Sequence, residues 1–271
     1  MQLIREPAVA GMFYPASEKK LKEQLEYLFD LTSLQKKYNN VYGLVAPHAG
    51  YIYSGKTAAF GYHSVSRKIY ERAIIISPSH REYFPGISVF DGDAYKTPLG
   101  NMPIDIELRK RFEMNSKFIF SSTKGHIAEH AVEVHLPFIQ YLYGNIPIVP
   151  IVIGDQSKIY LDELAKKLSE VSDEHTLIIA SSDLSHFYSR VEANQLDSII
   201  SDRISSFEFK ELQTDLEKRN CEACGGGCIV SLMSAAQKLG KTNSQIIHRS
   251  DSSETSGDTS EVVGYLSAVI Y

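Results

Sequence analysis

Short apolar runs rich in β-branched residues alternate with amphipathic stretches along the chain, and this alternation limits the folds open to it. The runs predict β-strands at 41–46, 73–77, 146–153, 176–180 and 262–270. Apolar residues at helical spacing predict helices at 18–29, 105–112, 131–143, 158–171, 196–206 and 229–239. Several strands are apolar at every position, as in a sheet covered on both faces. We therefore expect an α/β fold, with three α/β/α layers around a mostly parallel or mixed sheet.

Weaker local patterns predict where two helices begin or end, a hairpin, a loop and the number of domains. Ser17 is suited to cap the helix that begins at residue 18, and Gly240 is suited to end the helix that reaches residue 239. The less regular segment 86–103 predicts a hairpin at one edge, and the Ser-rich segment 250–260 predicts a long polar loop. Because no linker divides the chain, we expect a single domain over residues 1–271.

Composition excludes several classes of protein. The net charge is −5, with 28 basic and 33 acidic residues interspersed, which predicts no nucleic-acid partner. The apolar runs are far shorter than a membrane span, and the first seven residues lack the pattern of a leader, so we expect no membrane insertion. The cysteines, Cys221, Cys224 and Cys228, are odd in number and clustered, which suits a cytoplasmic protein better than a disulfide framework.

Three histidines follow the ends of predicted strands. His48 comes after the strand at 41–46, His80 after 73–77 and His186 after 176–180. In open α/β sheets the loops at the carboxyl ends of the strands converge and bind ligands. Taken singly, each histidine is more simply a hydrogen-bonding loop residue, but the common placement of all three favours one shared metal or acid/base site.

A second cluster spans residues 126–135. Glu129 and Glu133 are four residues apart and would share a helix face, whereas His130 and His135 are five apart and would not. This spacing differs from that of a zinc-protease helix. We expect a substrate-facing or supporting role for this segment, and a helix start with satisfied hydrogen bonds is an equally good interpretation.

The cysteine cluster surrounds three glycines and leads into a predicted helix. Glycines allow the backbone to approach a ligand closely, and a helix N-terminus stabilises a thiolate. A single Cys-x-x-Cys pair does not make a structural zinc site, so buried and inert cysteines are the alternative. Tyr51, Tyr53 and Tyr188 flank the histidine motifs and Asp258 precedes the last strand. These residues would line or close the same cleft, although scaffold tyrosines and a solvated loop are the simpler interpretation.

These residues form a set of motifs that resembles the Memo family over essentially the whole chain and in order. The motifs are REPAVAGMFYP at 5–15, APHAGY at 46–51, PSH at 78–80, EHAVEVHLP at 129–137, SSDLSH at 181–186, SGD at 256–258 and VGY at 263–265. The resemblance implies a fold shared with class III extradiol dioxygenases. In those enzymes two histidines and a carboxylate hold non-haem Fe(II), and a further histidine acts as acid and base.

Carried over by motif, the resemblance implies that His48 and His80 bind the metal. It implies that His186 is the acid/base residue, with Asp183 beside it. Where the dioxygenases have a carboxylate ligand, Memo proteins have a cysteine at a Cys-Gly step, which Cys224 matches.

This chain departs from the pattern by continuing with two more glycines and Cys228, so Cys228 is the alternative ligand. Two imidazoles and a thiolate suit copper and zinc as well as iron. The family resemblance implies one bound transition metal ion, Fe(II) or Cu ahead of Zn, and redox activity. The residues expected to face a substrate are His130, Glu133, His135, Tyr51 and Asp258.

The leading hypothesis is a metal-dependent oxidoreductase of unknown substrate. The alternatives are a non-catalytic module that binds a peptide, a phosphopeptide or a partner protein in the same cleft, and a metallohydrolase. The resemblance also implies partners. Animal members of the family act in cell motility by engaging phosphorylated receptor tails, and microbial members are associated with radical-SAM and AMMECR-type proteins.

Overall fold

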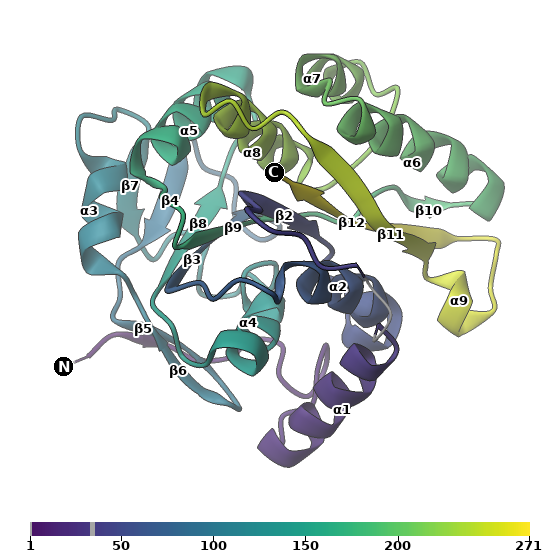
Figure 1. Cartoon of the computed structure of the whole chain (residues 1–271), viewed down its shortest axis with the longest axis horizontal. Coiled ribbons are helices and arrows are strands. Elements are labelled where there is room, and N and C mark those ends of the chain that lie inside the picture. The colour runs from purple at the N-terminus through teal and green to yellow at the C-terminus, as the bar shows by residue number, and fades with distance from the viewer. Residues whose placement is uncertain (1, 33–35) are drawn as a thin grey trace.

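The computed structural model describes residues 2–32 and 36–271 as a large mixed β-sheet with helices on both faces and a smaller sheet beside it (Figure 1). In spatial order the large sheet contains β10 (His186–Tyr188), β12 (Val262–Ile270), β2 (Gly43–Ala46), β9 (Thr176–Ser181), β3 (Arg72–Pro78), β8 (Ile148–Ile153), β4 (Ile87–Phe90) and β7 (Ile119–Ser122), and β11 (Ser244–Asp251) also pairs with β12. The smaller sheet contains β1 (Ile4–Arg5), β5 (Ala94–Thr97) and β6 (Gly100–Pro103). The predicted α/β class with a mixed sheet is confirmed.

The helices divide between the two faces of the large sheet. One face is covered by α1 (Glu18–Asp30), α2 (Tyr51–Val65) and α4 (Leu136–Tyr143), which follows the short 3₁₀ helix η1 (Glu133–His135). The other is covered by α3 (Ile106–Glu113), α5 (Lys158–Val171), α6 (Arg190–Ser205), α7 (Phe209–Glu217) and α8 (Gly226–Lys238). A short helix, α9 (Ser253–Ser256), precedes the last strand.

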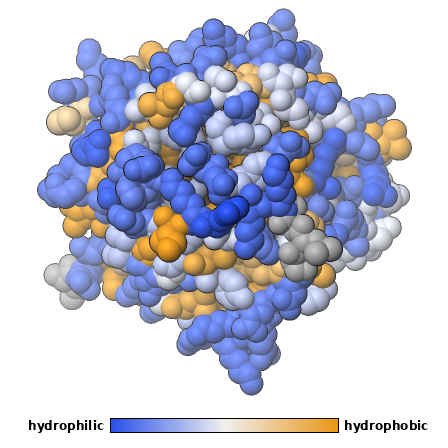
Figure 2. All heavy atoms as spheres, in the orientation of Figure 1, coloured by the Kyte–Doolittle hydropathy of each residue, from blue (hydrophilic) through white to orange (hydrophobic). Residues whose placement is uncertain are grey.

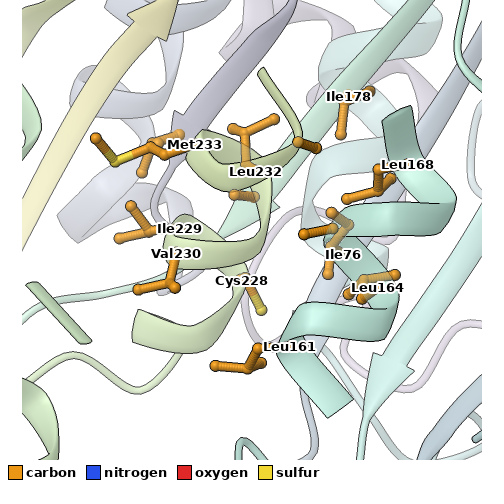
Figure 3. Packing of buried hydrophobic residues seen from close by; sticks show 14 of the residues in the cluster. Ile76, Leu161, Leu164, Leu168, Ile178, Cys228, Ile229, Val230, Leu232 and Met233 are labelled. Atoms are coloured by element: carbon orange, nitrogen blue, oxygen red, sulfur yellow. The ribbon is translucent and has the colours of Figure 1, made fainter. Parts of the chain in front are cut away.

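Successive residues of the central strands belong to different cores. In β3, Ile74 and Ile76 pack into the core under α5 and α8, whereas Ala73 and Ile75 pack into the core under α1, α2 and α4. Figure 3 shows α8 against α5, with Ile76 and Ile178 among the apolar side chains between them. Burial on both faces explains why these strands are apolar at every position.

Three neighbouring parallel strands place the histidine loops side by side. β9 lies between β2 and β3 and pairs in parallel with both. The segments that follow these strands therefore leave the sheet at one edge; two of them carry His48 and His80, and the third leads to His186 at the start of β10. This arrangement is the one expected for a ligand site in an open α/β sheet.

Some local predictions were wrong. The helix predicted at 131–143 begins only at η1, because Glu129 accepts hydrogen bonds from the backbone N–H groups of His130 and Ala131 and holds them in a turn. The helix predicted from 196 begins at Arg190, where Ser189 and Glu192 form a capping box.

The polar segment 250–260 is not entirely a loop, since it contains the end of β11 and all of α9. The hairpin predicted within 86–103 is formed by β5 and β6.

The surface fits the balanced composition. Figure 2 shows a face dominated by hydrophilic residues with apolar ones scattered among them. Within residues 2–32 and 36–271, no helix is both long enough and apolar enough to cross a membrane.

Candidate metal centre

His48 is fixed by hydrogen bonds on three sides. Its backbone N–H donates to Asp183 Oδ1 at 2.7 Å, and its Nδ1 lies 2.7 Å from Ser181 Oγ at the end of β9. Its Nε2 lies 3.2 Å from Cys224 Sγ. Because Nδ1 is held by the protein, Nε2 is the nitrogen that faces the thiol.

His80 is oriented by the buried side chain of Glu129. The backbone N–H of His80 donates to Glu129 Oε2 at 2.6 Å, and His80 Nδ1 lies 2.9 Å from Glu129 Oε1. Burial favours the neutral form of Glu129, but the hydrogen bonds from His80 outweigh it and lower the pKa of this carboxyl. The imidazole therefore keeps Nε2 available to a ligand.

Cys224 completes the group from the loop before α8. The candidate ligand atoms of His48, His80 and Cys224 all lie within 4.8 Å of one another. The backbone N–H of Asp183 donates to the sulfur at 3.3 Å. Burial and the nearby Asp183 carboxylate raise the pKa of the Cys224 thiol. A bound cation would reverse this effect, because a metal ion stabilises a coordinated thiolate.

Gly225 allows the cysteine loop to lie directly against the end of β9. A Cβ atom at this position would lie 2.0 Å from the carbonyl oxygen of Ser181 and 2.9 Å from Ser182 Cβ. The Gly225 N–H donates to Ser182 Oγ at 3.0 Å, and Gln156 Nε2 donates to the Cys224 carbonyl at 2.7 Å. The thiol is thus brought to His48 by a backbone contact that only glycine permits.

The other two cysteines lie away from the histidines. Cys228 is buried among the apolar side chains between α8 and α5 (Figure 3), and burial raises its pKa. Burial also raises the pKa of Cys221, to about 11. Among the described residues, the cysteine that shares a metal-compatible group with the histidines is Cys224.

The chemistry of the donors fits a transition metal ion. Two imidazole nitrogens and one sulfur converge, and each imidazole is anchored through Nδ1, which is the usual support for metal-binding histidines. A second group, made of His80, Glu129 and His130, also has its atoms within 4.8 Å. It fits a metal less well, because Glu129 Oε1 already accepts from the N–H groups of His130 and Ala131 and contacts His80 Nδ1.

The structure places His130, and not His186, against both candidate ligands. Its ring centroid lies 4.8 Å from that of His80 and 5.4 Å from that of His48. Its Nδ1 is buried without a hydrogen bond among the described residues; it lies 3.2 Å from Glu129 Oε1 but outside hydrogen-bond geometry. Burial lowers the pKa of His130 to about 4, which keeps it neutral at neutral pH.

His186 and Asp183 lie at the same cavity, which has a volume of about 560 Å³ and is also lined by His48, His80 and His130. His186 Nδ1 is 3.9 Å from Glu222 Oε1, and burial lowers the pKa of this imidazole. Burial raises the pKa of Asp183 to about 7, against the opposing effect of the hydrogen bond from the His48 backbone.

Of the five residues expected to face a substrate, His130 and Asp258 line this cavity. Glu133, His135 and Tyr51 do not line it; they are buried, and their polar groups form hydrogen bonds within the protein. His135 Nε2 is 2.8 Å from Ser181 Oγ, and Tyr51 donates its hydroxyl hydrogen to the Val134 carbonyl at 2.7 Å.

Glu133 holds the N-terminal segment in place. It pairs with Arg5, accepts the Ala8 N–H at 2.8 Å and the Val9 N–H at 3.1 Å, and takes the hydroxyl hydrogen of Tyr14. Of the flanking tyrosines, Tyr53 lines the cavity, whereas Tyr188 lines a neighbouring one.

Sequence reasoning missed the anchors of the two histidines. Ser181 and Glu129 both stood within the motifs, but their partners are distant in the chain, and no spacing rule connects them. Several residues that line the cavity were also not identified, including Met12, Phe13, Ile52, Phe187 and Glu261. A possible signal was the placement of Phe187 directly after His186.

Comparisons with known proteins point to one family. The chain matches the family described as Memo-like protein over residues 5–269. It is 36% identical over 268 residues to a MEMO1 family protein of Thermoplasma volcanium, with 98% of each chain covered. It is 36% identical over 271 residues to one of Methanosarcina acetivorans, with 98% of this chain and 99% of that protein covered.

A solved structure shares the fold. The crystal structure of an uncharacterized protein from Escherichia coli K12 matches with a TM-score of 0.60 at 12% identity, and covers 84% of this chain and 99% of that one. The match over residues 5–269 and the identity to full-length relatives show that the chain belongs to the Memo-like family.

Proposed function

We propose that this protein binds one transition metal ion, Fe(II) or Cu, on His48, His80 and Cys224, and that it acts as an oxidoreductase on a small molecule in the adjoining cavity. The observation that supports this most is the convergence of two anchored imidazoles and one half-buried thiol within 4.8 Å. A bound metal of this kind supplies redox chemistry, and the thiolate tunes its potential.

The protein's own groups have separate tasks in this proposal. Ser181 and Glu129 hold the two imidazoles in fixed orientations through Nδ1. Asp183, whose pKa is raised to about 7 by burial, is suited to exchange a proton near neutral pH, and His186 lies at the same cavity. We propose these two residues as the ones that move protons to and from a bound substrate.

The proposal is tested by elemental analysis of protein purified without oxygen. We expect about one iron or copper per chain, lost in His48→Ala, His80→Ala and Cys224→Ser. Cys228→Ser is the matched control, because its sulfur lies in the apolar core, and we expect it to keep the metal. Unchanged metal content in His48→Ala and His80→Ala would contradict the proposed ligands.

The reaction class needs a second measurement. An oxidoreductase should consume oxygen or reduce an added electron acceptor as substrate disappears. Hydrolysis of esters that requires the metal but no acceptor would point instead to a metallohydrolase.

The remaining proposals rest on the family resemblance and on the three free cysteines. We propose a cytoplasmic location, since free thiols suit a reducing compartment. We propose radical-SAM and AMMECR-type proteins as partners, which co-purification from the native cell would test.

A further inference from the structure

The cavity above the candidate metal centre has an apolar wall built from separate parts of the chain. Met12 comes from the N-terminal loop, Ile52 and Tyr53 from the start of α2, and Phe187 from β10. These side chains are 73%, 62%, 40% and 71% exposed, respectively. Large apolar side chains that remain exposed and gather at one cavity usually mark a surface that a ligand covers.

Phe187 is held at this cavity by an unusual backbone conformation. Its φ is +64°, in the left-handed region that bulky residues rarely adopt. It lies between His186 and Tyr188, where the pairing of β10 with β12 is irregular. Such a conformation costs free energy, as does the exposure of the ring, and costs of this kind are concentrated at ligand sites.

The outer part of the cavity lining carries carboxylates and no basic side chain among the described lysines and arginines. Asp258 and Glu261 line the cavity together with Asp183. Hydrogen bonds from Ser260 lower the pKa of Asp258, which keeps it ionised. Arg81 lies near His130 but does not line the cavity.

The carboxylates of Asp258 and Glu261 line the same cavity as the apolar side chains of Met12, Ile52 and Phe187. The mouth of the cavity is therefore apolar on part of its lining and negative on another part. A small anionic ligand seated at this part of the lining would place its charge against Asp258 and Glu261.

We infer that the cavity takes a small molecule with an apolar body and a protonated amine. The body lies against Met12, Ile52 and Phe187, and the amine lies near Asp258 and Glu261. A volume of about 560 Å³ suits a small molecule. This inference rests on the proposed function, because it takes this molecule to be the substrate of the metal centre.

The test compares two probes that differ in charge but share a phenyl ring and a two-carbon linker: 2-phenylethylamine and 3-phenylpropionate. Calorimetry at low ionic strength measures both, with metal-loaded protein and with protein stripped by a chelator, in which neither probe can bind a metal. We expect the amine to bind about tenfold more tightly in both forms, a ratio that corresponds to ~1.4 kcal/mol. Equal or tighter binding of the carboxylate would overturn the inference.

Variants test the acidic part and the apolar part of the cavity lining separately. Asp258→Asn with Glu261→Gln should abolish the preference for the amine, whereas Phe187→Ala should weaken both probes alike by several-fold. The matched control, Glu23→Gln with Glu26→Gln, removes the same charge from the exposed side of α1 and should keep the preference. A preference that survives Asp258→Asn with Glu261→Gln also overturns the inference.

Metal analysis of the same preparations distinguishes this inference from the proposed function. Amine selectivity in a protein that never takes up metal would contradict the metal centre and leave the ligand class supported. Full metal binding without amine selectivity would contradict the ligand class alone.

Discussion

The carboxylate of Glu129 accepts a hydrogen bond from the backbone N–H of His80 at 2.6 Å, and it also contacts the imidazole Nδ1 of His80 at 2.9 Å. One buried side chain thus fixes both the position and the ring orientation of a candidate ligand. Glu129→Gln keeps the shape of this contact but removes its charge. We expect metal affinity to fall by about 10- to 100-fold. Competition with a chromogenic chelator measures this change.

Glu107→Gln, on the exposed side of α3, provides the control for that measurement. It should leave affinity unchanged. Equal affinities of wild type and Glu129→Gln would mean that the His80 orientation does not depend on this carboxylate.

The close approach of Gly225 to β9 gives a second prediction. In Gly225→Ala, the new Cβ would lie 2.0 Å from the Ser181 carbonyl oxygen, so the loop must move and take Cys224 with it. We expect loss of metal together with a fall in the free energy of unfolding. Elemental analysis and urea unfolding measure the two effects. Gly240→Ala has open space but a φ of +72°, so it should cost about 1 kcal/mol from backbone strain and keep the metal.

The main fold could be predicted from the sequence because burial on both faces leaves a clear pattern in β2, β3, β8 and β9. Helix α2 could not. Gly55 and Gly61 interrupt it, and these residues disfavour a helix when taken alone. In the structure, a Cβ at Gly61 would lie 2.9 Å from Ser267 Cβ, so glycine lets α2 approach β12. The gain from close packing outweighs the poor local preference.

For the candidate site, the sequence was enough to expect which strand ends meet, but not which side chains touch. His48 and His80 were expected together because their strands end at one edge. The contact of His130 with both rings depends on a turn that Glu129 holds through backbone hydrogen bonds. The spacing of Glu129 and Glu133 indicated a helix instead. Glu129 forms this local turn while it also binds His80, which is 49 residues away, and the spacing of the motif gave no sign of that second contact.

Arg5 gives a prediction about stability. It is buried, pairs with Glu133, and donates from Nε to the His126 carbonyl at 3.1 Å. Arg5→Met leaves the Glu133 charge buried without its partner, and we expect a loss of about 3–5 kcal/mol in the free energy of unfolding. Adding Glu133→Gln should recover part of that loss, because it removes the unpaired charge. Urea unfolding of both variants tests this; a loss that stays the same in the double variant would contradict it.

His126 gives a prediction about pH. Burial lowers its pKa from the usual 6.5 to about 3, and it contacts Tyr95 and Ser88 in its neutral form. Above the unfolded pKa neither state binds a proton here, so stability is unaffected. As pH falls from 6.5 towards 3, the unfolded chain gains a proton that the folded protein excludes, and stability falls. The slope is up to about 1.4 kcal/mol per pH unit.

In chelator-treated protein, His126→Gln should therefore lose stability less steeply between about pH 6 and pH 4. The slope of the free energy of unfolding should fall by up to about 1.4 kcal/mol per pH unit. His135, whose pKa burial also lowers to about 3, keeps part of the acid sensitivity. The exposed His175→Gln should follow the wild-type curve. A slope that is the same in all three proteins would show that His126 is protonated in the fold.

The contact between His48 and Cys224 joins positions 176 residues apart in the chain. Bringing such distant groups together is costly in entropy while the chain is still open. A nascent or unfolded chain therefore does not hold these donors together, and the full donor set exists only after β2, β3 and the start of α8 have docked. Metal binding would then be a late step of maturation, because only folded molecules hold all three ligands together.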